Sequence, residues 1–544
     1  MQTVALKRIL AMLAVAGTTM QGVTATGPAA APAAAPASAA PASVWHAFDG
    51  GYDGGSYGGS YGGSSYGGGS SYGGGSGYDG GSGYDGGGSG GYSSRDMWDS
   101  DGTTTTAPAT MQAVAQAIGA DRMHAAGYTG RGVGIALIDT GVTKVPGLAG
   151  ANVVHGPDLS FESQNATTRY VDTFGHGTHL AGIMVGNDRT TGFQGVAPGA
   201  KLTSVKVGVG DGSVDVVQVL AAIDWVVEHR RDDPMNPIRV LALAYGTDSA
   251  QDYRTGPLAF AVEQAWKAGI VVVVAAGNGG TTATRLVNPA YDPFVLAVGA
   301  ADDRGTASPS DDVLGAFSSR GDTARRPDVV APGRSLVSLR APGSTIDVAY
   351  PGARVGSARF KGSGTSQASA VVAGAVAGLL QARPTLTPDD VKDLLRRTAT
   401  PLSRADAGGR AGEVSVYTAA RTAVSGTRQA YTASTGIGTL EAARGTSHVT
   451  LDGVALTGEK DIFGNAFDTR AWARASAAGT SWNGGSWMGV GWTGTTWTSG
   501  GSGLAWSGRA WSGRAWSGRA WSGTTWSGTA WAGNGWSGAG WPGR

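Results

Sequence analysis

The sequence contains no cysteine among its 544 residues. Disulfide frameworks, thiol nucleophiles and thiolate metal sites are therefore excluded. An excess of charge of either sign is also missing, because 41 Lys and Arg residues stand against 40 Asp and Glu residues. Without a strong field there is no electrostatic basis for binding nucleic acid or an anionic membrane, and we expect neither partner.

Long hydrophobic runs are absent as well. Lys7 and Arg8 precede an apolar run at residues 9–17, which is shorter than the ~20 residues that a membrane-spanning helix needs. Small residues follow and end in Val23-Thr24-Ala25. This order predicts a signal peptide over residues 1–25, and a secreted or cell-surface-associated protein.

Glycine is abundant, with 93 residues. Residues 26–109 are first rich in Ala and Pro and then repeat Gly, Ser and Tyr, with no aliphatic residue over 49–92. Such a segment cannot bury a core, so we expect a disordered leader. A flexible spacer is the simple interpretation, and weak adhesive contacts through its tyrosines are the alternative.

Ordinary composition returns over residues 110–424, where short apolar runs alternate with amphipathic stretches. The apolar runs do not alternate with polar residues, which is typical of parallel strands buried on both faces. The clearest strands are expected at 133–138, 202–207, 240–243 and 270–275, and the clearest helices at 216–229 and 258–268. A further helical run at 391–397 follows the helix start Thr387-Pro388-Asp389-Asp390, with Thr as the cap and Pro in the first position. The pattern predicts an α/β fold in which helices cover both faces of a parallel sheet, flanked by low-complexity termini.

The remaining residues are interpreted as a linker over 425–479 and a Trp-Ser-Gly repeat tail over 480–544. Tryptophan recurs every fifth residue from Trp482 to Trp497, and again in a shifted phase from Trp506. Five-residue spacing matches neither helix nor strand periodicity, so no amphipathic element is expected. A low-complexity tail is one interpretation, and contact of exposed rings with a cell wall or glycan is the other.

Asp139 follows the first expected strand, at the edge of the sheet where α/β enzymes build their sites. A turn or helix cap is the ordinary role of such an aspartate. His176 and His179 then lie among glycines before a helical run at 180–185. A metal pair is disfavoured because a third ligand and an acidic partner are missing, and we interpret His179 as a structural histidine.

Ser366 follows a glycine-rich lead and precedes a helical run at 371–380. Serine there is usually a cap, but a nucleophile fits better beside a matching Asp and His. Asn278 follows the strand at 270–275. Its amide is placed to donate to a tetrahedral intermediate, and a turn residue is the alternative because Asn-Gly is a strong turn pair.

These motifs together resemble the subtilisin-like serine proteases. The matching segments are Ile138-Asp139-Thr140-Gly141, His176-Gly177-Thr178-His179, Ala275-Ala276-Gly277-Asn278 and Gly364-Thr365-Ser366. The chain order Asp, His, Ser is the order of that family, and the resemblance extends over about residues 118–417. It implies a three-layer α/β fold and peptide-bond hydrolysis without a cofactor. Metal ligands stay open, because structural calcium sites of the family are scattered over loops.

The resemblance also assigns roles. Ser366 attacks the scissile carbonyl, His176 transfers the proton, Asp139 orients the imidazole, and Asn278 donates to the oxyanion. Gln367 and Ala370 replace a methionine and a proline that are usual after the nucleophile, and neither performs the chemistry.

Substrate contacts are expected from three segments of backbone. Ala244, Tyr245 and Gly246 stand where the family usually has another segment, so one wall of the substrate cleft is altered. Gly212-Ser213-Val214 forms the facing wall, and an extended substrate is expected to pair with both as an added strand. Ala275, Ala276 and Gly277 complete the cleft. Val287 stands where many relatives have a small residue at the base of the primary pocket, which predicts poor acceptance of large aromatic side chains.

The sequence therefore predicts a secreted serine endopeptidase that acts on proteins or peptides, and a monomer. A non-catalytic scaffold on a degenerate fold is the alternative, suggested by the altered cleft. A serine esterase is disfavoured, because Gly364-Thr365-Ser366-Gln367-Ala368 lacks the second glycine of the esterase motif.

Overall fold

The computed structural model describes residues 109–492, except 164, 403–410, 452–453 and 484, together with residues 497–498 and 512–513. The predicted signal peptide, the predicted leader up to residue 108 and most of the predicted repeat tail lie outside the described residues. These expectations stay predictions. In the part of the chain that is described, no helix has both the length and the apolar character needed to cross a membrane.

A mostly parallel β-sheet forms the centre of the fold. Its strands follow the order β10-β8-β7-β6-β1-β5-β2, and β9 pairs antiparallel with β8. All neighbours along that order are parallel. The strands are β1 Gly134–Asp139, β2 Val153–Asp158, β5 Lys201–Lys206, β6 Ile238–Leu243, β7 Val271–Ala275, β8 Leu296–Asp302, β9 Val313–Leu314 and β10 Val329–Pro332.

Burial explains why these strands read as continuous apolar runs. Every residue of β1, β7 and β8 is buried, because both faces of a parallel sheet are covered. The four strands expected from such runs agree with β1, β5, β6 and β7 to within two residues at each end. The expected α/β fold class is confirmed.

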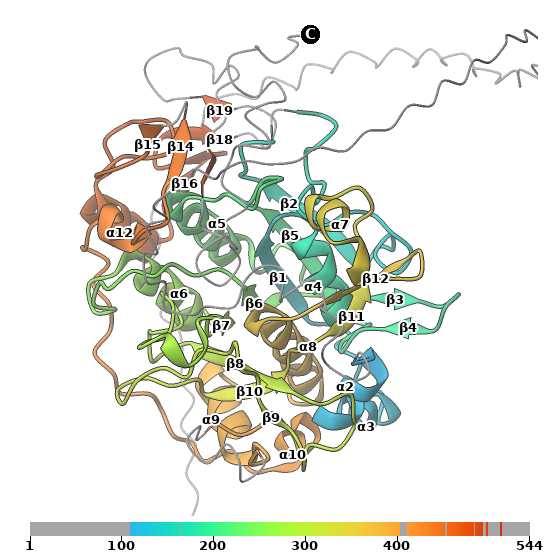
Figure 1. The fold of residues 1–544 in the computed structure, drawn as a ribbon. Coiled ribbons are helices and arrows are strands. Elements are labelled where there is room, and N and C mark those ends of the chain that lie inside the picture. Colours follow the sequence, from blue (N-terminus) through green and yellow to red (C-terminus); the bar gives the residue numbers. More distant parts are fainter. Residues whose placement is uncertain are drawn as a thin grey trace, which may run out of the picture. The chain divides into compact units, whose positions relative to one another are not determined.

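Helices cover both faces of the sheet (Figure 1). On one face α4 and α8 pack together, and α8 also contacts β6, β7, β8 and β10. On the other face α5 and α6 pack together, against β1 and β7 respectively. The helices are α2 Met111–Ile118, α3 Ala120–Ala125, α4 His176–Val185, α5 Val216–His229, α6 Pro257–Lys267, α7 Thr345–Ala349, α8 Thr365–Ala382, α9 Pro388–Thr398, α10 Val416–Arg421, α11 Leu440–Arg444 and α12 Thr469–Ala478.

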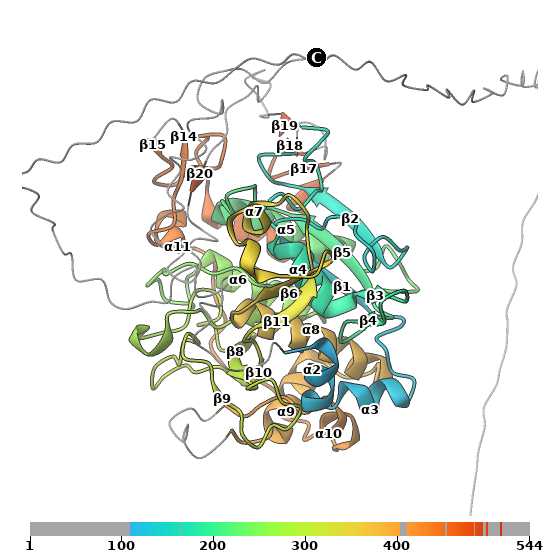
Figure 2. The same ribbon diagram turned by 45° about the vertical axis from the view of Figure 1, so that its right-hand side comes forward.

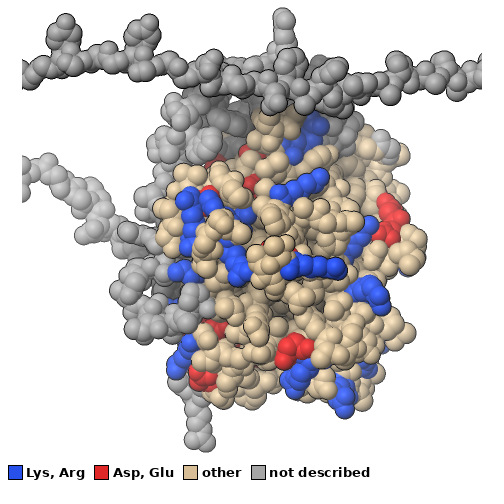
Figure 3. Space-filling model, turned by 90° about the vertical axis from the view of Figure 1, so that its right-hand side faces the viewer, with Lys and Arg blue, Asp and Glu red and all other residues tan. Residues whose placement is uncertain are grey.

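Smaller antiparallel strands lie outside this sheet. They are β3 Asn187–Asp188, β4 Phe193–Gln194, β11 Leu336–Leu339, β12 Arg354–Val355, β13 Arg359–Gly362, β14 Val449–Leu451, β15 Val454–Ala455, β16 Trp482–Asn483, β17 Ser486–Trp487, β18 Val490–Trp492, β19 Trp497–Thr498 and β20 Ser512–Gly513. On the face shown in Figure 3, Lys and Arg side chains are spread among neutral residues, with a few acids between them.

Residues 425–492, which we call the C-terminal extension, pack onto the domain. The structure differs here from the expected linker over 425–479, because this stretch forms α11, β14, β15 and α12. Leu440, Ala443 and Trp472 belong to the same core cluster as the central strands, and α11 packs against α5 and α6. Figure 2 shows α11 beside α6. Short helices of this kind are stabilised by tertiary packing, which composition does not reveal.

The first tryptophans of the repeat form antiparallel hairpins, although no amphipathic element was expected there. Trp482 pairs with Trp487 between β16 and β17, and Trp492 pairs with Trp497 between β18 and β19. Five-residue spacing conflicts only with an uninterrupted element, whereas a tight turn between two tryptophans brings them opposite each other. Trp482 and Trp487 are 9% and 2% exposed. The glycan interpretation therefore does not apply to these two rings.

Candidate active site

The four candidate residues lie at strand ends or helix starts beside the central sheet. Asp139 is the last residue of β1, and Asn278 follows β7 closely. His176 is the first residue of α4, and Ser366 is the second residue of α8. All four side chains are buried. The carboxyl ends of parallel strands share one edge, where an α/β fold forms its site.

Asp139 holds the imidazole of His176. Nδ1 of His176 lies 2.8 Å from Oδ1 and 3.0 Å from Oδ2 of Asp139. The backbone N–H of Thr140 donates to the same Oδ1 over 2.7 Å and orients the carboxylate. Because a carboxylate only accepts, Nδ1 carries the proton and the lone pair of the neutral ring is on Nε2. This is the tautomer that a general base at Nε2 requires.

Asp172, which is not among the site residues expected from sequence, holds the loop that leads from β2 to His176. Its Oδ1 accepts from the N–H of Gly175 over 2.6 Å and from the hydroxyl of Thr140 over 2.8 Å. Its Oδ2 accepts from the N–H of Thr178 over 2.7 Å. Burial raises the pKa of Asp172, and these hydrogen bonds oppose the rise.

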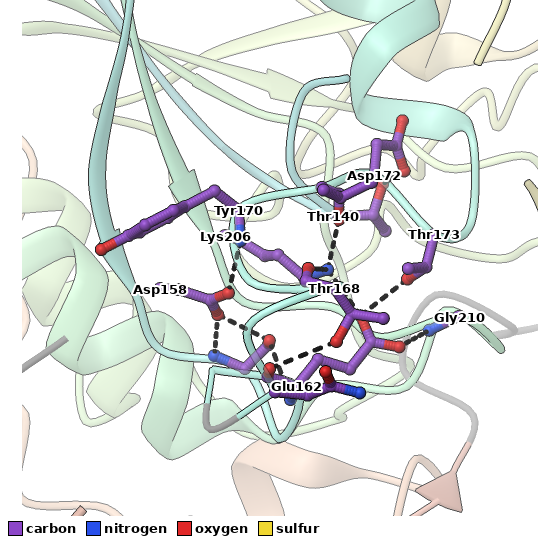
Figure 4. Close-up of polar contacts among 12 residues, drawn as sticks. Thr140, Asp158, Glu162, Thr168, Tyr170, Asp172, Thr173, Lys206 and Gly210 are labelled. Atoms are coloured by element: carbon purple, nitrogen blue, oxygen red, sulfur yellow. Dashed lines mark hydrogen bonds and ion pairs between the residues drawn. The ribbon is translucent and has the colours of Figure 1, made fainter. Parts of the chain in front are cut away.

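A buried ion pair supports the same loop (Figure 4). Nζ of Lys206 lies 2.5 Å from Oε2 of Glu162, and both side chains are almost fully buried. The ammonium also donates to the carbonyls of Thr168 and Val171. Lys206 is the β5 residue in register with Asp139. The pair therefore joins the loop before His176 to the strand beside Asp139.

Two carboxylates complete this support. Glu162 accepts from the hydroxyl of Thr173 over 2.7 Å and from the N–H of Gly210 over 3.0 Å. Asp158 accepts from the N–H of Tyr170 over 2.9 Å, and Figure 4 shows it beside the Glu162 cluster. Burial raises the pKa of Asp158, and the nearby ammonium partly offsets the rise. Buried carboxylates thus hold this loop at Tyr170, Thr173 and Gly175.

Asn278 is fixed against the first residue of α8. Its Oδ1 accepts from the N–H of Thr365 over 2.8 Å and from the Thr365 hydroxyl over 2.9 Å. Its Nδ2 is therefore the donor end. A Cβ built on Gly364 would lie 3.4 Å from this Nδ2 and 3.7 Å from the backbone nitrogen of Ser366. The side-chain amide of Asn278 and the backbone nitrogen of Ser366 therefore both lie beside the space next to Gly364.

Gly364 is required at this point of the chain. Its φ is +154°, and a Cβ there would lie 2.6 Å from Oε1 of Gln367. A side chain would fill the space between the two donors as well as strain the backbone. Gln367, which stands where the family usually has methionine, therefore packs against Gly364, two residues before Ser366.

Ser366 lies inside α8, which begins earlier than the helix expected at 371–380. The side chain is 1% exposed, and the first turn of a helix favours nearby negative charge. α8 packs against α4, whose first residue is His176. Ala370 continues the helix in place of a proline without interrupting it.

The expected edge Gly212-Ser213-Val214 is a tight loop. The N–H of Gly212 donates to the carbonyl of Val209 over 2.8 Å, and the N–H of Ser213 donates to Oδ1 of Asp211 over 2.8 Å. The φ of Gly212 is +82°, a conformation that favours glycine. Burial raises the pKa of Asp211 to about 6.

Ala244 and Tyr245 are both buried, so neither side chain lines an open wall. Burial and the charge of Asp215 raise the pKa of Tyr245 well above its ordinary value. The expected backbone role of this segment is compatible with inward side chains. Gly246 is followed by Thr247, whose backbone exchanges two hydrogen bonds of 2.9 Å with Asn288.

Val287 lies between two of the expected pocket glycines. A Cβ on Gly246 would lie 2.4 Å from Cγ2 of Val287, and a Cβ on Gly277 would lie 2.7 Å from Cγ1. The N–H of Val287 also donates to the carbonyl of Ala276 over 3.2 Å, directly after Ala275 ends β7. Gly246, Ala276 and Gly277 of the expected pocket therefore all lie next to the side chain or backbone of Val287.

His179 has the geometry of a structural histidine. Its Nε2 lies 3.1 Å from the carbonyl of Phe360. Burial and the nearby His176 lower the pKa of His179 to about 3. Among the described residues, no group of three His, Asp or Glu side chains is arranged to hold a metal ion.

The supporting residues were missed for different reasons. Asp172 stands inside the histidine motif, so its position alone was a usable signal. Thr365 adjoins the nucleophile in the same way. Glu162 and Lys206 are separated by 44 positions, and no local pattern predicts that they pair.

The fold and these contacts define a protein of the subtilisin class. The Subtilase family model matches residues 130–432, and the chain therefore belongs to the subtilase family. Serine protease AprX of Bacillus subtilis (strain 168) is 41% identical over 275 residues, covering 49% of this chain and 61% of AprX. Subtilisin DY of Bacillus licheniformis is 35% identical over 291 residues, covering 52% of this chain and 90% of that protein.

A solved structure, "Crystal structure of a cold adapted subtilisin-like serine proteinase", is 28% identical with a TM-score of 0.39, covering 53% of this chain and 88% of the other. Family membership identifies the domain as a serine-type endopeptidase, a hydrolase of peptide bonds in proteins or peptides.

Proposed function

We propose that this protein is a secreted serine endopeptidase that works through Asp139, His176 and Ser366, with Asn278 in the oxyanion hole. The observation that carries this proposal is the contact of His176 with Asp139, at 2.8 Å. The nitrogen donors around Gly364 support it independently. Secretion is proposed from the pattern of residues 1–25.

In the proposed mechanism, Oγ of Ser366 attacks the carbonyl carbon of the scissile bond while Nε2 of His176 takes its proton. The negative oxygen that forms is stabilised by Nδ2 of Asn278 and by the N–H of Ser366. The imidazolium, held by Asp139, then gives its proton to the leaving amine, and an acyl-enzyme results. Water then attacks the acyl-enzyme while Nε2 of His176 takes its proton. The imidazolium returns this proton to Oγ of Ser366, and the acid product leaves. No step uses a cofactor.

The direct test compares wild type with Ser366→Ala in casein cleavage and in labelling by a fluorophosphonate. We expect labelling of wild type alone and a loss of turnover of about 10⁶-fold in the variant, the scale for removal of a subtilisin nucleophile. Ser369→Ala, in the next turn of the same helix, is the matched control and should keep the label. An unlabelled wild type would favour the scaffold alternative.

We also propose that Val287 restricts the primary pocket to small side chains. Its methyl groups occupy the space against Gly246 and Gly277, so a bulky substrate residue would clash. Val287→Ala should raise the ratio of kcat/KM for phenylalanine over alanine before the scissile bond by on the order of 10-fold, since one or two methyl groups are worth about that much. An unchanged ratio in matched peptide anilides would contradict this placement.

A further inference from the structure

Arg444, in the C-terminal extension, has a fully buried guanidinium. Its Nε lies 2.7 Å from Oδ2 of Asp215, and its Nη2 lies 3.3 Å from Oδ1. Both side chains are 0% exposed. Nη1 and Nη2 also donate to the carbonyls of Gly458 and Lys460, each over 2.6 Å. A buried charge needs this degree of satisfaction, and the planar fork of arginine provides it.

Asp215 connects Arg444 to the first proposed wall of the cleft. It directly follows Gly212-Ser213-Val214 and is the N-cap of α5, where its Oδ1 accepts from the N–H of Val217 over 3.0 Å. Its own N–H donates to Gln218 over 2.8 Å. The point at which this wall enters α5 is therefore set by one carboxylate shared between the helix and the extension.

The second proposed wall is attached to the same part of the extension. Thr247, next to Gly246, donates its hydroxyl to the carbonyl of Ala443 over 2.7 Å. Ser249 donates to the carbonyl of Ala442. Between them, Asp248 accepts from the N–H of Thr446 over 2.7 Å. Three successive contacts thus join residues 247–249 to the chain on both sides of Arg444.

Tyr245 lies where the two attachments meet. Its ring is 1% exposed, and both Asp215 and Arg444 act on it electrostatically. We propose that Arg444 is a positioning residue, which holds the two walls of the substrate cleft at the spacing that an extended peptide needs. This inference rests on the proposed function, because the walls matter only if peptides bind there.

The chemistry of the pair predicts how variants differ. Arg444→Met leaves the Asp215 carboxylate buried without its partner, which drives local rearrangement at both walls. Arg444→Lys keeps the charge but loses the bidentate geometry, so it should be intermediate. Neither change touches Asp139, His176 or the donors around Gly364.

The experiment compares two substrates in the full-length protein. A tetrapeptide anilide contacts both walls, whereas p-nitrophenyl acetate reaches only the nucleophile and the oxyanion donors. Rates are divided by the fraction of active sites labelled with a fluorophosphonate. For Arg444→Met we expect kcat/KM for the tetrapeptide to fall at least 10-fold, mainly through KM, and acetate hydrolysis to stay within 2-fold. Arg444→Lys should lie between this variant and wild type.

Trp487→Phe is the matched control, because it weakens the docking of the extension at a distance from both walls. It should lower the melting temperature but keep both rates within 2-fold of wild type. Equal losses on the two substrates in Arg444→Lys, or no loss on either, would overturn the positioning role. If Arg444→Met does not fold, Arg444→Lys decides alone. A wild type without label or activity would instead reject the proposed function.

Discussion

Asp172 in the active-site loop and Asp224 beneath the C-terminal extension show two ways of satisfying a buried carboxylate. Asp172 takes its donors from residues 140, 175 and 178, all within 32 positions. Asp224 takes its donors from Trp472, Ser476 and Trp487, about 250 positions away. Burial raises the pKa of both acids. Both buried carboxyl groups need hydrogen-bond donors. Only the donors of Asp172 lie near it in the sequence, so only this arrangement can be recognised as a motif.

Asp224 is a second anchor of the extension on α5, in addition to Asp215. Nε1 of Trp472 and Nε1 of Trp487 each donate to Oδ2 over 2.9 Å, and the hydroxyl of Ser476 donates to Oδ1 over 2.6 Å. One helical turn further, Glu228 accepts from the hydroxyl of Ser481. Trp472 and the repeat residue Trp487 are therefore structural in this part of the protein.

Of three changes that test this comparison, the largest effect is expected in the active-site region. Asn278→Ala removes one of the two proposed oxyanion donors, so kcat should fall about 10²–10³-fold. Asn236→Ala, whose amide contacts Asp233 away from the site, should keep normal turnover. The measurement is steady-state hydrolysis of a peptide anilide at saturating substrate. Turnover within 3-fold of wild type would show that Asn278 does not donate to the oxyanion.

A smaller effect should be confined to the extension. Trp487→Phe removes one donor to the buried carboxyl group of Asp224, and leaving a buried acceptor short of a hydrogen-bond partner costs about 1–3 kcal/mol. We expect the free energy of unfolding in urea to fall by that amount, in a Ser366→Ala background that prevents self-cleavage. Trp225→Phe is the control on the same helix, because Trp225 stacks on His229 with centroids 4.4 Å apart. Equal losses in the two variants would mean that the contact with Asp224 adds nothing.

The smallest effect is a dependence on pH. The folded-state pKa of Asp224 is raised by burial, although hydrogen bonds from Ser476, Trp487 and Trp472 oppose the rise. The stability that this group contributes is thus fully present below about pH 4, its ordinary pKa, and is lost as the pH rises through the folded-state value. Asp224→Asn should flatten this part of the curve of unfolding free energy against pH. The slope that it removes cannot exceed about 1.4 kcal/mol per pH unit.

Several strands of the central sheet could be predicted from sequence because they are continuous runs of apolar residues. The runs that became β1 and β7 are continuous and apolar, and α5 was expected at the bounds it has, 216–229. The start of α9 was also readable, since Thr387 caps it and Pro388 occupies its first turn. The fold class follows from such local rules, because each strand is buried in the same way.

The sequence by itself determined the α/β class, the order of the four motifs and the identity of Asp139, His176, Asn278 and Ser366 as candidates. Tertiary structure alone decided that Glu162 pairs with Lys206, that Trp487 docks on Asp224 and that Arg444 reaches Asp215. The reason is distance along the chain. A buried charge must be paired, but its partner can come from any segment that the fold brings near, and spacing in the sequence does not record which one.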